Sequence, residues 1–103
     1  MTQILRSALA SEDIENAVTY YLDVAGFVVA DRFLEEYDQA LNHIARHPGT
    51  GSQRYAQLSA LGDMRFWTLK KFPYAVFYRE RSRALEIIRV LHQSADIPNH
   101  LQP

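Results

Sequence analysis

Apolar side chains recur at helical spacing in the first half of the chain and gather into strand-like runs in the second half. Residues 11–25 carry one helical stripe, and residues 30–45 carry another, which Pro48 ends. Ser11 is placed to cap the first helix and Gly26 to end it with a left-handed residue. Because few residues separate the two stripes, we expect an antiparallel helical hairpin.

Three runs in the second half are rich in β-branched and aromatic residues and are separated by short breaks. They span residues 64–72, 74–80 and 85–92, and we expect them to form antiparallel strands. Residues 3–9 add a fourth strand before the first helix. The expected order is β-α-α-β-β-β, an α+β fold with the helices on one sheet face, in a single domain of residues 1–103.

The last run does not separate cleanly into an apolar and a polar face. Strict alternation places Leu85, Ile87, Arg89 and Leu91 on one face, and Glu86, Ile88, Val90 and His92 on the other. A small sheet with helices on one side leaves its second face partly open. We therefore expect one of these mixed sets to line a concave surface with a charged residue at its centre.

Charge is divided unevenly along a chain whose formal net charge is only -1. Residues 1–47 hold eight acidic side chains and three Lys or Arg, whereas residues 48–103 hold four acidic side chains and eight Lys or Arg. The near-neutral total argues against broad nonspecific binding to nucleic acid. The chain has no cysteine, which excludes disulfides and thiolate catalysis, and it shows no signal peptide or membrane span. We expect a cytoplasmic protein.

The second-half cations are the main candidate for chemistry, because arginine binds carboxylates and phosphates bidentately. They are Arg54, Arg65, Lys70, Lys71, Arg79, Arg81, Arg83 and Arg89. We interpret them as one recognition surface, although Arg81 and Arg83 fit a solvated turn. Arg89 interrupts an apolar strand and needs a partner, either an internal acid such as Glu86 or Asp96 or an external ligand. His92 either transfers protons or fixes the strand end by a hydrogen bond.

Other candidate sites have simpler interpretations. His43 and His47 lie one helical turn apart, but the zinc-protease pattern requires Glu after the first His, and Ile44 stands there. Two histidines near a helix C-terminus are favoured by the helix dipole, so no metal is expected. The glycine-rich stretch at residues 49–52 follows a helix and lacks the Lys of a phosphate loop. No hydrolase motif is present.

Three segments together resemble the ParE branch of the RelE/ParE toxin superfamily. They read "ARHPGTGSQR", "LGDMRFWTLKKFPYAVFYRE" and "LEIIRVLHQSADIPNHL", and with the helical hairpin the resemblance covers almost the whole chain. It implies the toxin of a type II toxin-antitoxin system, bound and silenced by a ParD-like antitoxin in a hetero-oligomer. It also implies inhibition of DNA gyrase, with no catalytic residue, no cofactor and no sequence-specific nucleic-acid binding by the free toxin.

The resemblance assigns roles to surfaces and leaves alternatives. Candidates for contact with the target or the antitoxin are Arg65, Lys70, Arg79, Arg89 and His92. The basic sheet and residues 94–103 are expected to face the target, and the helical hairpin and a sheet edge to dock the antitoxin. One alternative is a RelE-like mRNA endonuclease, which the slightly acidic charge disfavours. Another is a non-toxic module that binds an antitoxin and acts as a co-repressor.

Overall fold

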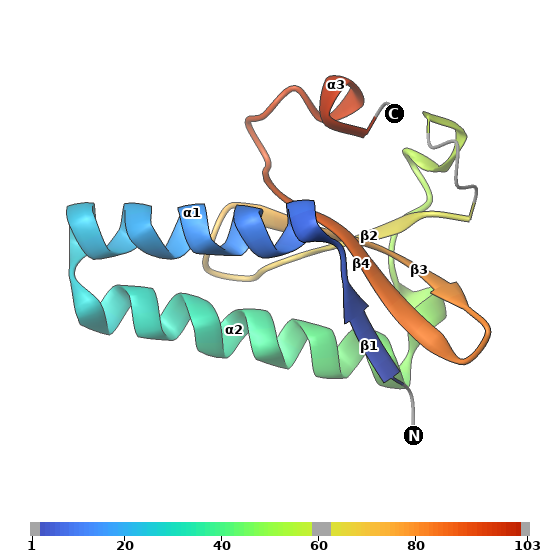
Figure 1. Ribbon diagram of the computed structural model, residues 1–103, viewed down its shortest axis with the longest axis horizontal. Helices are drawn as coiled ribbons and strands as arrows, with labels where there is room; N and C mark the ends of the chain where they lie inside the picture. The colour runs from blue at the N-terminus through green and yellow to red at the C-terminus, as the bar shows by residue number, and fades with distance from the viewer. Residues whose placement is uncertain (1–2, 59–62, 102–103) are drawn as a thin grey trace.

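The expected order of strands and helices is present in the computed structural model, which describes residues 3–58 and 63–101 (Figure 1). The elements are β1 (Gln3–Arg6), α1 (Ala8–Ala25), α2 (Phe27–Arg46), β2 (Arg65–Thr68), β3 (Tyr74–Arg81), β4 (Ala84–His92) and α3 (Ile97–Leu101). Short 3-10 turns occupy Pro48–Thr50 and Ala56–Leu58. The α+β class with β-α-α-β-β-β order is confirmed. The helix α3 was not expected from the sequence.

The four strands form one mixed sheet in the order β1-β4-β3-β2. The pairs β2–β3 and β3–β4 are antiparallel, as expected, whereas β1 pairs in parallel with β4. The parallel pairing follows from the connection between the strands. In the chain, the helical hairpin lies between β1 and β2 and returns to the end of the sheet where β1 begins, so that β2 runs in the same direction as β1 (Figure 1). Because β2 and β4 are both antiparallel to β3, β4 also runs parallel to β1. The strands β1 and β2 are therefore the two edges of the sheet.

The first helix begins earlier than its apolar stripe suggested. Ser7, not Ser11, is the N-cap, and its hydroxyl accepts a 2.9 Å hydrogen bond from the Ala10 N–H. The same hydroxyl donates to the Ile88 carbonyl at 2.7 Å, which ties the helix start to β4. Gly26 has a positive φ of 88°, as expected, but its ψ of 176° lies in an extended region that only glycine visits readily.

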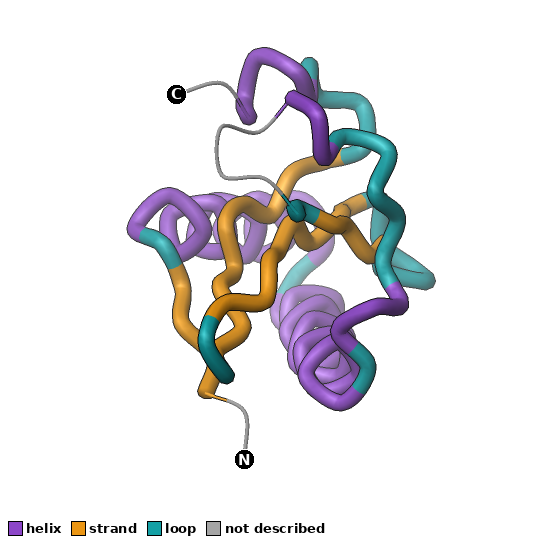
Figure 2. The backbone as a smooth tube through the Cα atoms, turned by 90° about the vertical axis from the view of Figure 1, so that its right-hand side faces the viewer, coloured by secondary structure: helices purple, strands orange, loops and turns teal. Residues whose placement is uncertain are grey.

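A first hydrophobic core joins both long helices to one face of the sheet. Figure 2 looks along these helices and shows the strands beside them. The largest fully buried side chains of this core are Phe33, Tyr37, Ile44, Val76, Tyr78, Leu85, Ile87 and Val90. Burial of so many large side chains is the main source of stability, at roughly 1.5–3 kcal/mol for a side chain such as Leu or Phe.

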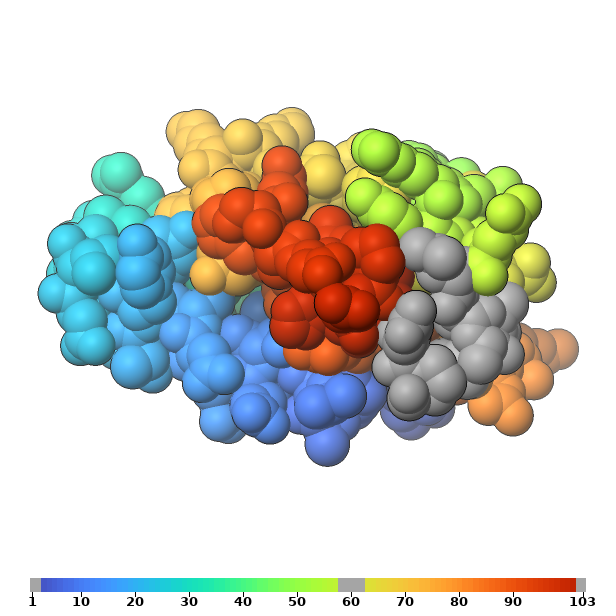
Figure 3. Space-filling view, turned by 90° about the horizontal axis from the view of Figure 1, so that it is seen from above, coloured from blue at the N-terminus to red at the C-terminus, as the bar shows by residue number. Residues whose placement is uncertain are grey.

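The opposite face of the sheet is covered, which corrects the expectation of an open concave surface. A second cluster of buried side chains lies there, formed by Met64, Ala75, Phe77, Leu91 and Ile97. Tyr55 from the segment after α2 and Leu101 from α3 pack against it. Figure 3 shows the C-terminal segment lying across this side of the molecule, next to the start of α1.

A bulge in β4 explains why strict alternation failed. Phe77 pairs with Arg89 but the next residue, Tyr78, pairs with Ile87, so β4 contains one extra residue at Ile88. Leu85 and Ile87 therefore face the helices together with Val90, while Leu91 belongs to the second cluster. The predicted sharing of one face by residues 85, 87, 89 and 91 is wrong.

Candidate interaction surfaces

Arg89 is held inside the protein by Asp13 of α1. Its Nε and Nη2 donate to the two carboxylate oxygens at 2.8 and 2.9 Å, and its Nη1 donates to the His100 carbonyl at 3.3 Å. The Arg89 and Asp13 side chains are only 14% and 13% exposed. The hydrogen bond to Asp13 raises the pKa of Arg89 above its usual value. The partner is an internal acid, as one of the two alternatives expected, but it is Asp13 and neither Glu86 nor Asp96.

Asp13 also completes the outer edge of β4. Where β1 ends, the Ser7 N–H donates to the Ile87 carbonyl, and three residues further along β4 the Val90 N–H donates to Asp13 at 2.9 Å. The carboxylate thus satisfies a backbone donor that the short strand β1 does not reach. Arg89 links α1, β4 and α3, and this position makes it a structural residue.

Arg79 is paired across the β3–β4 ladder. Its Nε donates to Glu86 at 2.8 Å, and Arg81 approaches the same carboxylate at 3.7 Å. The Arg79 side chain is 14% exposed and that of Arg81 is 65% exposed. The expectation that Arg81 belongs to a solvated turn region is confirmed by this exposure. Glu86 thus serves these two arginines and not Arg89.

Arg65 binds the backbone of the turn that follows α2. Its Nη1 donates to the carbonyls of Gly49 and Gly51 at 3.2 and 3.0 Å. The Tyr78 hydroxyl donates to the Pro48 carbonyl at 2.8 Å and accepts from the Gly51 N–H at 2.9 Å. Burial raises the pKa of Tyr78. These contacts give the His-Pro-Gly-x-Gly stretch a structural purpose, which is to anchor the turn to β2 and β3.

His92 fixes the end of β4 by hydrogen bonds to Ser94, as one of its two interpretations predicted. Its Nδ1 accepts a 3.0 Å hydrogen bond from the Ser94 N–H, and the Ser94 hydroxyl lies 2.7 Å from the same atom. Its ring meets Tyr74 edge-on at 5.2 Å between centroids. Because Nδ1 accepts from a backbone donor, the neutral ring carries its proton on Nε2.

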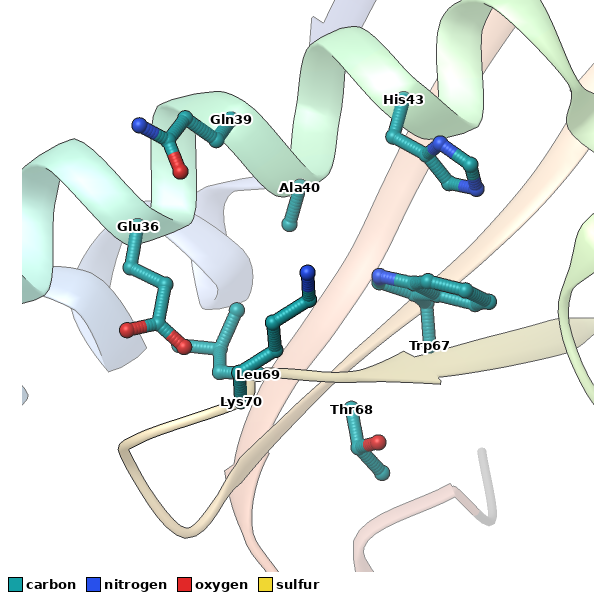
Figure 4. Close-up of a pocket in the computed structure, with 8 residues that line it drawn as sticks. All are labelled: Glu36, Gln39, Ala40, His43, Trp67, Thr68, Leu69 and Lys70. Carbon is teal, nitrogen blue, oxygen red and sulfur yellow. The ribbon is translucent and has the colours of Figure 1, made fainter.

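Lys70 is the exposed member of the five candidate residues and borders a groove. The α2–β2 groove, with a volume of about 370 Å³, is lined by Glu36, Gln39, Ala40, His43, Trp67, Thr68, Leu69 and Lys70. Figure 4 shows the Lys70 amine reaching toward α2 between Glu36 and Trp67. The His43 and Trp67 rings stack with centroids 4.6 Å apart and form its apolar end.

The five candidates do not form one surface, which corrects the expectation of a single basic face. Arg65 pairs with Tyr78 and His92 with Tyr74, so both lie on the face that the helices cover. Arg79 and Arg89 lie on the opposite face, because Arg89 pairs with Phe77 of the second cluster and Arg79 lies two residues beyond Phe77 on β3. Lys70 stands apart at the edge beside β2.

Exposed apolar side chains gather on the helical hairpin instead. On α1 and α2 they are Leu9, Tyr20, Leu22, Val24, Phe27 and Val28, and Phe27 is 74% exposed. Val24, Phe27 and Val28 flank Gly26, at the end of the hairpin that lies away from the sheet (Figure 1). Several exposed large apolar side chains near one end of the hairpin are typical of a binding site.

Metal and membrane sites have no support in the described part of the chain. The rings of His43 and His47 lie 5.4 Å apart, but residues 3–58 and 63–101 contain no group of three His, Cys, Asp or Glu side chains able to hold a metal ion. Within the same ranges no helix has both the length and the apolar character needed to cross a bilayer.

The architecture defines a small α+β protein of the RelE/ParE-like class. A solved structure described as the chromosomal ParDE toxin-antitoxin system from P. aeruginosa contains a similar chain, with a TM-score of 0.73 and 17% sequence identity. The match covers 89% of this chain and 96% of that chain. No curated protein sequence matches this chain.

The family follows from the sequence profile. Residues 4–97 match the family described as the ParE toxin of the type II toxin-antitoxin system parDE, and the chain therefore belongs to the ParE toxin family. The toxin component of a type II system is the function that this membership supports, and an antitoxin is its implied partner. The predicted resemblance is confirmed.

Proposed function

We propose that this toxin acts in the cytoplasm by binding and inhibiting DNA gyrase, and that a ParD-like antitoxin neutralises it. Family membership supports the toxin role, and the engagement of the candidate polar groups supports a binding mode of action. A nuclease mechanism would use Arg89 and His92 as part of its set, with Arg65, Lys70 and Lys71 in support, yet Arg89 donates to Asp13 and to the His100 carbonyl, and His92 accepts from the Ser94 N–H at the end of β4. A general acid or base must reach its substrate proton within hydrogen-bonding distance.

The overall charge supports the same choice of target. A protein that cuts mRNA on the ribosome works among RNA phosphates, and such binding draws its affinity from Lys and Arg. This chain has a formal charge of -1, and two of its sheet arginines are neutralised by internal carboxylates. Gyrase, as a protein target, needs a complementary surface and no catalytic group.

Antitoxin binding fits the exposed apolar surface of the hairpin. A partner helix or extended segment would bury Val24, Phe27 and Val28, which are 61%, 74% and 61% exposed in the free chain. Phe27→Asp should weaken antitoxin binding at least tenfold without unfolding the toxin, because the side chain makes little internal contact. Asn42→Asp, which adds the same charge at an exposed polar position of α2, is the matched control.

The gyrase proposal is tested by comparing two activities of the purified toxin. One assay follows supercoiling of relaxed plasmid DNA by gyrase, and the other follows the length of mRNA in a translating bacterial extract. We expect supercoiling to stop while mRNA stays intact, and addition of the antitoxin to restore supercoiling. Cleaved mRNA with unimpaired gyrase would contradict the proposal and favour the RelE-like alternative.

A further inference from the structure

The strand β1 forms one edge of the sheet and presents backbone groups that no strand pairs. The Ser7 N–H donates to the Ile87 carbonyl at 3.0 Å, so the backbone of Ser7 is directed toward β4. Successive residues of a strand direct their polar groups to opposite sides, so the N–H and C=O of Ile4 and Arg6 point away from β4. Among the described residues, no strand lies on that side of β1 (Figure 1). This edge can therefore accept another strand.

Apart from its short length, β1 lacks the features that usually prevent strand pairing. Residues 3–6 contain no Pro or Lys, and their register with β4 has no bulge. Arg6 is charged, but its guanidinium carbon lies 6.0 Å from the centre of the Tyr37 ring, on the face that the helices cover. The next part of the β4 edge is closed, because Asp13 accepts from the Val90 N–H. The protein thus covers one part of this side of the sheet and leaves β1 uncovered.

Apolar side chains at the same edge favour an apolar partner. Ile4 packs against the first core, so Leu5 points to the opposite side of the sheet, where it is 42% exposed. Beside it is a hollow of about 220 Å³, lined by Leu5, Arg6, Ser7, Glu86, Ile87 and Ile88. Leu9, in the first turn of α1, is 53% exposed. A strand added to β1 would cover Leu5 with a side chain of its own.

A second copy of this chain matches the edge by symmetry. When two β1 strands pair antiparallel about a two-fold axis through Leu5, Ile4 of each copy lies opposite Arg6 of the other. Because these are the residues with outward N–H and C=O groups, each pair exchanges both of its hydrogen bonds. The two Leu5 residues form the central pair, with Cα atoms about 4.5 Å apart. An axis through Ile4 or Arg6 would leave one of these two residues without a partner in β1.

We propose that two copies of this chain pair through their β1 edges, antiparallel and centred on Leu5, so that one sheet continues across the dimer. The backbone bonds set the register, and the paired Leu5 side chains supply the apolar contact. The contact is small, so the dimer is weak and forms at high protein concentration. The hairpin end around Gly26 lies away from this edge and stays accessible (Figure 1). The pairing requires neither gyrase nor an antitoxin.

Single cysteines test the register, because the chain has no cysteine of its own. Leu5→Cys puts the two thiols in the central pair, at a Cα separation of about 4.5 Å that suits a disulfide. Gln3→Cys is the control on the same strand, because residue 3 lies opposite residue 7 in this register and its two copies are far apart. Thr68→Cys is the exposed control on the other edge strand, β2. Under mild oxidation, we expect Leu5→Cys to form a covalent dimer about tenfold faster than either control.

Sedimentation velocity tests the same contact without cross-linking. From about 1 µM to about 300 µM, the wild-type chain should shift from monomer toward dimer. Leu5→Lys sets two like charges opposite each other and should abolish this shift, whereas Thr68→Lys on the other edge should leave it unchanged. Folding of each variant is checked by circular dichroism. If Leu5→Lys does not fold, the cysteine variants decide.

Three results would overturn the proposal. The first is a chain that stays monomeric at every concentration while the three cysteine variants cross-link equally slowly. The second is a dimer that Leu5→Lys leaves intact, because another surface would then hold it. The third is a monomeric chain in which the purified antitoxin protects the Leu5→Cys thiol from alkylation, because the edge would then belong to the antitoxin.

Discussion

Removing Asp13 should destabilise the toxin strongly, because one carboxylate serves three donors. Among the described residues, Asp13→Ala leaves Arg89 with the His100 carbonyl alone as a partner, and it removes the acceptor of the Val90 N–H. Breaking a buried ion pair from one side costs about 3–5 kcal/mol. Most domains have a total stability of about 5–15 kcal/mol, so this single loss is a large fraction of it.

A double variant tests the coupling between Asp13 and Arg89 in the free energy of unfolding. In the double variant Asp13→Ala/Arg89→Met no buried charge lacks a partner, so we expect it to be more stable than Asp13→Ala alone. Urea unfolding followed by circular dichroism and by Trp67 fluorescence gives the free energies. A loss below about 1 kcal/mol for Asp13→Ala, or additive effects in the double variant, would refute the structural role of Arg89.

Three further predictions concern stability. Gly51→Ala should lower the free energy of unfolding by about 1–3 kcal/mol in a thermal unfolding assay, because its Cβ would lie 2.5 Å from the Tyr78 hydroxyl oxygen. Gly49→Ala is the control and should leave the stability unchanged, because no described atom lies within 4 Å of its Cβ. Equal losses of stability in the two variants would contradict this. Tyr37→Phe should raise the free energy of unfolding by about 1 kcal/mol in urea, since the buried Tyr37 hydroxyl has no described hydrogen-bond partner, and a loss would show a hidden partner. Burial raises the pKa of Tyr37 and Tyr78, so the folded state keeps protons that the unfolded state releases, and stability should fall as the pH rises above about 10. Urea titrations from pH 8 to 11 check this, and Tyr37→Phe should flatten the decline.

Periodicity predicted the elements well because each one buries a continuous apolar face. The helix stripes and the three later strands have the predicted order, and Gly26 separates the helices with a positive φ. The start of α1 was misjudged because Ser7 and Ser11 are both good caps by type. Only the contact of Ser7 with the Ile88 carbonyl of β4 distinguishes them, and that contact is tertiary.

The candidate site was predicted less well, because residue type does not show which partner a charge will meet. Arg89 was correctly singled out as needing a partner, but Asp13 lies 76 residues away in sequence. The bulge at Ile88 changes which side chains share a face, and no local signal marks it. The stacking of His43 on Trp67 was missed because the two histidines were considered only as metal ligands or as residues favoured by the helix dipole, and Trp67 is distant in sequence.

The gyrase claim is tested most directly by following two kinds of synthesis in living cells. Labelled thymidine and labelled methionine are supplied within minutes of inducing the toxin without its antitoxin, and uptake of each is followed together. Our account predicts that thymidine incorporation falls first, because replication fails when gyrase is inhibited. A prior fall in methionine incorporation would contradict it and place the target at the ribosome.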